Sequence, residues 1–369
     1  NGRPVKLHGV NHHDTTPDAG YAMTPAQIER DVRLCKDHNI DTIRTSHYPP
    51  DPLLLELCDE LGIYVIDEAD LETHGAMVGR VPPSYGWLTR DARWRERYLD
   101  RADRLFERDK LHPCVIMWSL GNESGGGCNA DAMYVLLRSR SDLPVHYEGA
   151  IHSRRRAYDV GSEMYPTVER VISVGEGRSS VRRLNDRPYV LCEYAHAMGV
   201  GPGGIEDYWR QIYAHEALAG GCVWEMVDHA VLHEDGSYTY GGDHGEWEHD
   251  GNFCCDGIFY PDRTPSTGAR VVRHAYRPLR VRHVGGDFFM VFNATSFTPG
   301  DAFTLRFEWS DGGVAELVCD VDPLRQQSLL VRPTAQGTAD EGEGLRRNRM
   351  RWVTVTVTRR ETGEEVSRE

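Results

Sequence analysis

Two glutamates close apolar runs at places where a carboxylate is out of keeping with the residues before it. Glu123 ends the run MWSLGNE and is followed by Ser124 and three glycines, and Glu193 ends the run YVLCE. Two carboxyl groups can hydrolyse the acetal of a sugar, because one protonates the leaving oxygen while the other, ionised, attacks or stabilises the cationic sugar. The acid needs a raised pKa and the nucleophile must stay ionised, so the two groups need different surroundings.

The elements that would position these glutamates are eight short apolar runs separated in several places by helical patterns. This alternation predicts a parallel sheet closed as a (β/α)₈ TIM barrel. A doubly wound open sheet is the alternative, but no G-x-G-x-x-G follows the first run, which removes the usual cofactor signal of that fold. The predicted strands are residues 5–11, 40–47, 63–70, 115–123, 145–150, 161–166, 189–194 and 220–228.

Capping signals mark the first two helices between these runs. Thr24 is a predicted N-cap, with Pro25 in the first helical position and Gln27 completing a capping box. Asp51-Pro52 opens the second helix, and Gly62 is its predicted C-terminal stop.

The pattern changes near residue 285, where apolar and polar residues begin to alternate with period two, as in RWVTVTVTRR. Such alternation is typical of antiparallel strands with one buried face. We therefore predict two domains, a catalytic barrel over residues 1–284 and a small immunoglobulin-like β-sandwich over 285–369.

Active sites of TIM barrels are built at the carboxyl ends of the strands. The predicted strand ends carry acids, imidazoles and large aromatic residues, where ordinary turns would carry glycine, asparagine, serine and threonine. Trp118, Tyr165 and Trp224 are expected to offer apolar faces to a sugar. The other strand-end side chains that we single out are those of Asn11, His12, His13, Asp14, Ser46, His47, Tyr48, Asp67, Glu68, Asp70, Glu72, His74, Asn122, Tyr147, Glu148, Met164, Tyr194, His196, Glu225 and Asp228.

Composition excludes several classes of partner. Lys and Arg number 42 against 57 Asp and Glu, which leaves a net charge of −15 and argues against nucleic acid. The sequence contains no apolar run of membrane-spanning length and no signal segment at its start, so no membrane partner is expected. Nine cysteines without a CxxC pair indicate free thiols in a reducing compartment, and the expected location is the cytoplasm.

Five motifs together resemble glycoside hydrolase family 2, in particular its bacterial lactase-type β-galactosidases. They are SHYPPDP, DEADLETHG, IMWSLGNESG, LCEYAHAMG and NFCCDGIFYPDRTP, in this order along residues 46–265. The resemblance implies a retaining enzyme that releases terminal β-D-galactosyl residues by double displacement. It also implies a small-molecule β-galactoside, such as lactose, as the substrate.

The same resemblance implies roles for single positions. Glu123 resembles the acid/base and Glu193 the nucleophile of the family. A magnesium ion would be held by Glu72, His74 and Glu123, and a sodium ion by the Phe253 carbonyl and Asp256, where some relatives have asparagine. The substrate-binding residues implied in this way are His13, His47, Asn122, Tyr165, His196 and Trp224.

Other readings remain open at this point. Members of the family carry further domains before and after the barrel, so we expect a fragment or one part of a split enzyme, whose partners are the missing domains or further copies of itself. A non-catalytic carbohydrate-binding or assembly fragment is one alternative. A β-mannosidase is another, and a β-glucuronidase is disfavoured because no lysine follows Lys110 to bind the sugar carboxylate.

Overall fold

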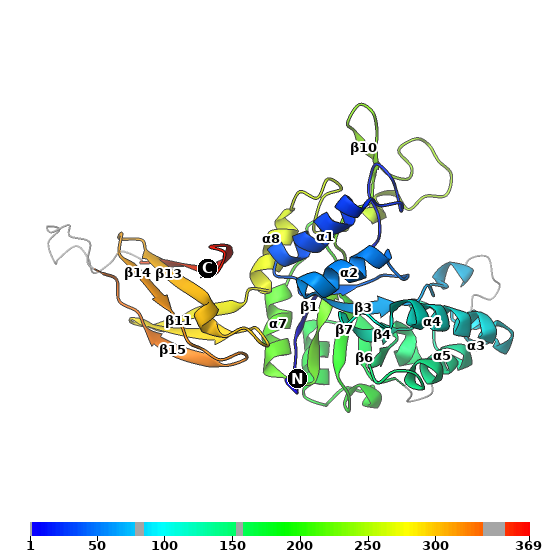
Figure 1. The fold of residues 1–369 in the computed structure, drawn as a ribbon, viewed down its shortest axis with the longest axis horizontal. Coiled ribbons are helices and arrows are strands. Elements are labelled where there is room, and N and C mark those ends of the chain that lie inside the picture. Colours follow the sequence, from blue (N-terminus) through cyan, green and yellow to red (C-terminus); the bar gives the residue numbers. More distant parts are fainter. Residues whose placement is uncertain (1, 78–84, 153–157, 335–350) are drawn as a thin grey trace. The chain divides into compact units, whose positions relative to one another are not determined.

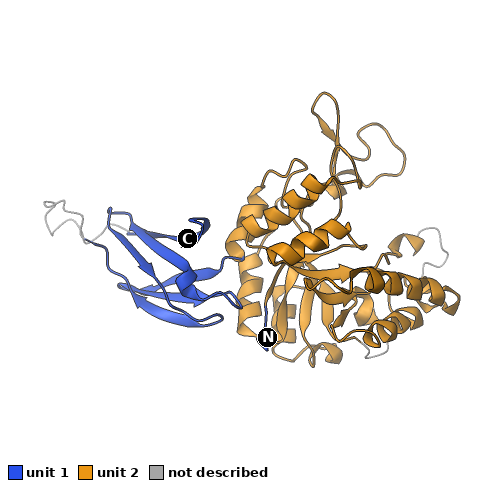
Figure 2. Cartoon of the chain, in the orientation of Figure 1, with its two compact units in different colours: residues 1–5, 276–369 blue, residues 6–275 orange. Residues whose placement is uncertain are grey.

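A computed structural model describes residues 2–77, 85–152, 158–334 and 351–369. The chain forms two compact units, residues 6–275 and residues 1–5 together with 276–369 (Figure 2). Within the described residues, every helix is too short or too polar to cross a lipid bilayer.

The larger unit contains an eight-stranded parallel sheet in the order β5-β4-β3-β2-β1-β8-β7-β6. Because β1 pairs with both β2 and β8, the sheet curls into a nearly closed barrel, and the predicted TIM barrel is confirmed. The strands are β1 (Leu7–Asn11), β2 (Thr42–Arg44), β3 (Tyr64–Glu68), β4 (Val115–Ser119), β5 (Val145–His146), β6 (Gly161–Met164), β7 (Tyr189–Tyr194) and β8 (Leu218–Val223).

Helices surround the strands (Figure 1), so most strand residues are buried, as expected of a parallel sheet covered on both faces. The fifth predicted strand is shorter than expected, since a 3₁₀ helix, η3 (Glu148–His152), begins soon after β5. The helices are α1 (Pro25–Asp37), α2 (Pro52–Leu61), α3 (Trp87–Arg90), α4 (Arg95–Asp109), α5 (Cys128–Arg138), α6 (Val168–Gly175), α7 (Ile205–Ala214) and α8 (Thr267–Ala275); η1 (His74–Met77), η2 (Ala92–Trp94) and η4 (Arg182–Leu184) are 3₁₀ turns.

The capping signals read from the sequence are confirmed. Thr24 and Gln27 form the predicted capping box at the start of α1. Asp51 accepts a hydrogen bond from the Leu53 amide at the start of α2, and Gly62 ends that helix with a left-handed φ of 70°. These local interactions fix where two of the barrel helices begin or end.

A long connection follows β8 before α8. It contains a small hairpin, β9 (Val231–Leu232) with β10 (Tyr238–Thr239), and the 3₁₀ turn η5 (Gly251–Cys254). The hairpin extends away from the barrel strands (Figure 1). The end of the connection returns to the barrel, where Ile258 donates its backbone N–H to the Glu225 carbonyl at 2.9 Å.

The smaller unit is a β-sandwich of a three-stranded sheet, β11-β12-β15, and a four-stranded sheet, β14-β13-β16-β17. Phe289 and Val291 of the first sheet and Phe307 and Val357 of the second belong to one buried core. This strand order is immunoglobulin-like, as predicted. The elements are β11 (Leu279–Gly285), β12 (Phe288–Asn293), η6 (Gly300–Ala302), β13 (Phe303–Trp309), β14 (Val314–Val318), β15 (Gln326–Leu330), β16 (Val353–Arg359) and β17 (Glu365–Arg368).

The predicted domain boundary at residue 284 falls inside a strand of the sandwich. β11 pairs antiparallel with β12 from Leu279 onward, and the two compact units divide between residues 275 and 276. The predicted boundary lies late because the alternation of this strand spans only residues 279–282 before His283 interrupts it.

Candidate active site

The carboxyl ends of the barrel strands bring the predicted site residues together around one arginine. Arg44, at the end of β2, is fully buried, and its Nε and Nη2 donate to the two carboxylate oxygens of Glu68 at 2.9 and 3.1 Å. Its Nη1 donates to Glu193 Oε1 at 3.1 Å and its Nη2 to Asn122 Oδ1 at 3.0 Å. One guanidinium therefore links β2, β3, β7 and the turn after β4.

The charges of this cluster support one another. Burial alone would lower the pKa of Arg44, but Glu68 and Glu193 raise it above its usual value. Burial would likewise raise the pKa of Glu68, yet Arg44 and His47 lower it to about 2. The buried pair is thus fully ionised and serves as a fixed electrostatic anchor.

Glu193, on β7, is 5% exposed and accepts two hydrogen bonds. Besides Arg44, the Tyr165 hydroxyl donates to Glu193 Oε2 at 2.9 Å, and His47 Nε2 lies 3.9 Å from Oε1. Burial and the neighbouring Glu193 raise the pKa of Tyr165 well above its usual value, so the hydroxyl keeps its proton. Both donors hold the Glu193 carboxylate in a fixed orientation.

Glu123, after β4, has different surroundings. Its side chain is 34% exposed, and its Oε2 lies 3.0 Å from His74 Nδ1. Its backbone has a φ of +36°, which residues other than glycine rarely adopt. Its backbone N–H donates to Glu148 Oε2 at 3.0 Å, and burial raises the pKa of Glu148 to about 7, with Arg44 opposing the rise.

The residues predicted to bind the sugar lie in contact with this centre or with one another. His47 stacks on Trp224 with ring centroids 5.4 Å apart, and His13 packs edge-on against both at 5.7 and 5.5 Å. The ring centroids of Tyr165 and His196 lie 5.6 Å apart. Asn122 Nδ2 lies 3.3 Å from His47 Nε2, so aromatic and amide groups line the approach to both glutamates.

The predicted magnesium ligands are mutually placed to hold a cation. Glu72, His74 and Glu123 each offer a ligand atom, and these atoms lie within 4.8 Å of one another. Burial raises the pKa of Glu72, and Glu123 adds to the rise. Two carboxylates and one imidazole, largely exposed, leave room for the waters that Mg²⁺ retains.

The predicted sodium position also has a suitable feature. Asp256 is 2% exposed, and its Oδ2 accepts a hydrogen bond from Trp224 Nε1 at 2.8 Å. Its Oδ1 is buried without a hydrogen-bond partner among the described residues, which is the kind of oxygen that a cation satisfies. Burial and Glu225 raise the pKa of Asp256 to about 7.

Two carboxylates of the site, Glu225 and Glu148, lie at predicted strand ends, but no role was predicted for them from the sequence. Glu225 is buried between two histidines, with its Oε2 2.6 Å from His13 Nδ1 and its Oε1 3.3 Å from His229 Nε2. Burial would raise the pKa of Glu225, but the neighbouring His13 lowers it below its usual range. The four-residue spacing of Glu225 and His229 after an apolar strand was the available signal. Glu148 is the second such carboxylate.

Trp118 is not a sugar platform, which corrects one expectation. It is 1% exposed, its Nε1 donates to Ser141 Oγ at 3.1 Å, and its ring packs edge-on against Phe106 of α4 at 5.6 Å. Side chains alternate along β4, and its neighbour Ser119 points inward to Glu68, with Oγ donating to Oε2 at 2.6 Å. Trp118 therefore belongs to the layer between the strands and the helices.

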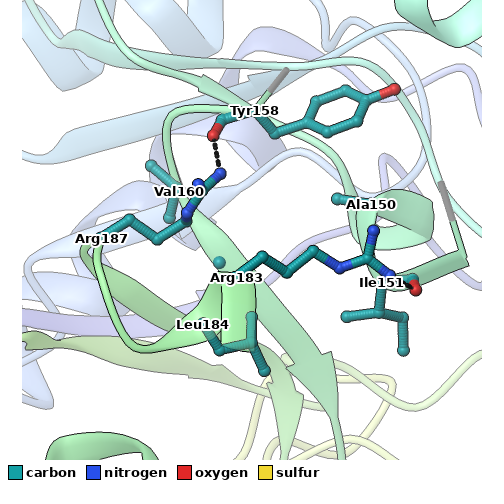
Figure 3. Close-up of a pocket in the computed structure, with 8 residues that line it drawn as sticks. Ala150, Ile151, Tyr158, Val160, Arg183, Leu184 and Arg187 are labelled. Atoms are coloured by element: carbon teal, nitrogen blue, oxygen red, sulfur yellow. Dashed lines mark hydrogen bonds between the residues drawn. The ribbon is translucent and has the colours of Figure 1, made fainter. Parts of the chain in front are cut away.

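A separate pocket lies beside η3 and η4 (Figure 3) and carries no comparable chemistry. Arg183 and Arg187 cross it, and their guanidinium groups donate to the backbone carbonyls of Ile151 and Tyr158. None of its described lining residues supplies a carboxylate, an imidazole or a thiol: they are Ala150, Ile151, Tyr158, Val160, Gly161, Arg183, Leu184 and Arg187.

Known proteins are similar to this chain in sequence. A β-galactosidase of Actinobacillus pleuropneumoniae is 39% identical in an alignment of 347 positions that covers 85% of this chain and 34% of that protein. A β-galactosidase of Vibrio cholerae serotype O1 is 40% identical in an alignment of 353 positions that covers 92% of this chain and 32% of that protein. The chain thus spans about a third of the length of these relatives.

Solved structures share the fold. A Faecalibacterium prausnitzii β-glucuronidase, 21% identical, aligns with a TM-score of 0.54 over 75% of this chain and 49% of that one. A Ruminococcus gnavus β-glucuronidase, 22% identical, aligns with a TM-score of 0.55 over 73% and 50%. The sequence profile described as glycosyl hydrolases family 2, TIM barrel domain, matches residues 1–281. The chain therefore belongs to glycoside hydrolase family 2 and contains the TIM barrel domain of that family.

Proposed function

We propose that this chain carries the catalytic centre of a retaining β-galactosidase. The observation that carries the proposal is the contrast between two glutamates at the carboxyl ends of β4 and β7, strands that are not adjacent in the barrel. Glu193 is buried and accepts from Arg44 and Tyr165, whereas Glu123 is partly exposed at the mouth of the barrel. An ionised nucleophile and a proton donor need this difference in surroundings.

In the proposed reaction Glu193 attacks the anomeric carbon while Glu123 gives its proton to the departing oxygen. The bond between the sugar and the leaving group breaks, and a covalent bond from the sugar to Glu193 forms. Glu123, now ionised, then takes a proton from water, which attacks the same carbon and releases Glu193. Asn122 would hold the sugar 2-hydroxyl, and Trp224 with His13, His47 and His196 would bind the galactosyl ring.

We further propose Mg²⁺ at Glu72, His74 and Glu123, and Na⁺ at the Phe253 carbonyl and Asp256. A divalent ion there would supply positive charge beside the acid/base. Titration calorimetry with Mg²⁺ tests the first site: Glu72→Gln should weaken binding, whereas Glu29→Gln, in an exposed ion pair with Arg33 on α1, should not.

The substrate should be a neutral sugar. Glu225, Asp228 and Asp256 lie on the β8 side of the site, beside Trp224 and His196. A uronate would bring its own carboxylate toward this acidic group, where like charges repel. We therefore expect turnover of 4-nitrophenyl β-galactoside and little of the β-glucuronide.

A mechanism-based label tests the assignment directly. A 2-deoxy-2-fluoro-β-galactosyl donor with a dinitrophenolate leaving group slows hydrolysis of the glycosyl-enzyme more than its formation. Mass spectrometry should then find the sugar on Glu193. A label on another residue would contradict the role of Glu193. A chain that carries no label, while the glucosyl or mannosyl analogue labels it, would contradict the sugar.

A non-catalytic carbohydrate-binding fragment is the second candidate, because the chain matches only about a third of its relatives. It predicts galactoside binding without label or turnover. Repeating the labelling with the segments of the relatives that flank the match added in trans tests whether further domains are needed, and sedimentation analysis tests whether the protein is a homo-oligomer.

A further inference from the structure

The turn that presents Glu123 is held from the neighbouring strand end, and we propose that Glu148 is its positioning residue. In this proposal the Glu148 carboxylate fixes the backbone of Glu123 so that the Glu123 side chain reaches the leaving-group oxygen. The inference rests on the proposed role of Glu123 as acid/base. Glu148 itself touches no reacting atom and is not offered as a catalytic residue.

The contact is direct and buried. Glu148 is 3% exposed, and its Oε2 accepts the Glu123 backbone N–H at 3.0 Å. Glu123 needs such support because its φ of +36° is costly for a residue with a side chain. Without the Glu148 side chain the Glu123 N–H would lose its hydrogen-bond acceptor, so Glu148 is well suited to hold a strained residue.

The rest of the turn is held on both sides, which leaves Glu148 to fix its centre. On the β3 side, Asn122 donates its backbone N–H to the Leu71 carbonyl at 2.8 Å. On the β5 side, the Tyr147 hydroxyl donates to the Gly125 carbonyl. Gly149 packs so closely there that a Cβ would lie 2.8 Å from the Gly125 oxygen. Residues 147–149 therefore form a surface against which the turn of residues 122–125 is set.

Two substitutions separate the contact from the size of the side chain. Glu148→Gln keeps an oxygen that can accept the Glu123 N–H, whereas Glu148→Leu removes the acceptor at similar volume. Asp159→Leu is the matched control: Asp159 Oδ2 accepts the backbone N–H of Val145 at 2.9 Å, at the other end of the same short strand. All three variants are made in the full-length protein.

Hydrogen exchange of the peptide that covers residues 120–126 is the first measurement. Losing the hydrogen bond to Glu148 should speed exchange of this peptide by roughly 10- to 100-fold in Glu148→Leu. Glu148→Gln should stay within a few-fold of wild type, and Asp159→Leu should leave this peptide unchanged. Unchanged exchange in Glu148→Leu would overturn the proposal, and this readout requires no activity.

Dependence on the leaving group is the second measurement. Displacing a general acid by a fraction of an ångström should lower turnover of a methyl or phenyl galactoside by up to about 100-fold. A dinitrophenyl galactoside needs little protonation and should lose less than about five-fold, with Glu148→Gln restoring most of the difference. Equal losses on both substrates would overturn the positioning role. Label on Glu193 in wild type tests the proposed function separately, so the two failures are distinguishable.

Discussion

At the scale of single residues, Arg44 is the buried positive charge that pairs with the carboxylates of this site. Its guanidinium contacts Glu68, Glu193, Asn122 and the Asn11 side chain inside the barrel. A carboxylate buried without a cation would lose several kcal/mol of solvation. Arg44 thus couples the stability of the barrel to the ionised state that the proposed nucleophile requires.

Replacing Arg44 alone should be worse than replacing the buried pair. Arg44→Met leaves Glu68 without its partner and should lower the free energy of unfolding by about 3–5 kcal/mol. Arg44→Met combined with Glu68→Met should recover a large part of that loss. Urea denaturation of both variants measures this, and an equal loss in the double variant would contradict the coupling.

Tyr165 should affect chemistry more than folding. Tyr165→Phe removes the hydroxyl that donates to Glu193 Oε2, a bond to a charged group worth about 1.5–3 kcal/mol. We expect kcat to fall by roughly 10- to 100-fold, because the proposed nucleophile loses one of its two hydrogen-bond donors. Tyr134→Phe, which removes a hydroxyl bonded to Asp159 at 2.9 Å, is the control and should keep wild-type kcat.

At the scale of elements, local sequence determines where the helices of the βα units begin, whereas tertiary structure determines the backbone conformation of the turns after the strands. The helix starts follow from capping residues beside them in the chain, as at α1 and α2. The turns after β4 and β6 instead place Glu123 and Tyr165 at φ values of +36° and +48°. Such strain persists only where surrounding structure imposes it, and here both residues belong to the proposed site.

Removing the cap of α1 should cost stability without touching the site. Thr24→Ala deletes the hydroxyl that accepts the Gln27 N–H and should lower the free energy of unfolding by about 1 kcal/mol. Thr24→Ser keeps a hydroxyl and should stay close to wild type. Thermal unfolding distinguishes them, and similar losses in the two variants would argue against capping as the cause.

At the scale of the whole molecule, two carboxyl groups whose pKa values shift in opposite directions make opposite contributions to the dependence of stability on pH. Burial and the neighbouring Asp109 raise the pKa of Asp67 well above its usual value near 3.8. Such a group contributes stability below that value and loses the contribution as pH rises through the folded-state pKa. Burial would raise the pKa of Asp59, but hydrogen bonds with the Cys114 side chain and His112 lower it. The stability that Asp59 contributes is therefore present above pH 3.8 and lost toward acid pH.

Two isosteric variants should therefore shift in opposite directions with pH. Relative to wild type, Asp67→Asn should gain stability as pH rises above about 4, by up to about 1.4 kcal/mol per unit. Asp59→Asn should be less stable than wild type at neutral pH and converge with it at acid pH. Denaturation at a series of pH values checks both, and parallel curves for the two variants would contradict the assignment.

The sequence by itself determined the barrel, the order of its strands, the helix caps and the sandwich, because each depends on local periodicity, capping or turn chemistry. The same strand-end reading put Glu123, Glu193, His47 and Trp224 in one place, since parallel strands end on one side of a barrel. Only tertiary structure decided that Trp118 faces the helices, that β11 belongs to the sandwich, and which partners Arg44, Glu148 and Glu225 have in the site. Those outcomes depend on which face of a strand turns inward and on charges that meet across strands distant in sequence. The local sequence around each residue determines neither of these two features.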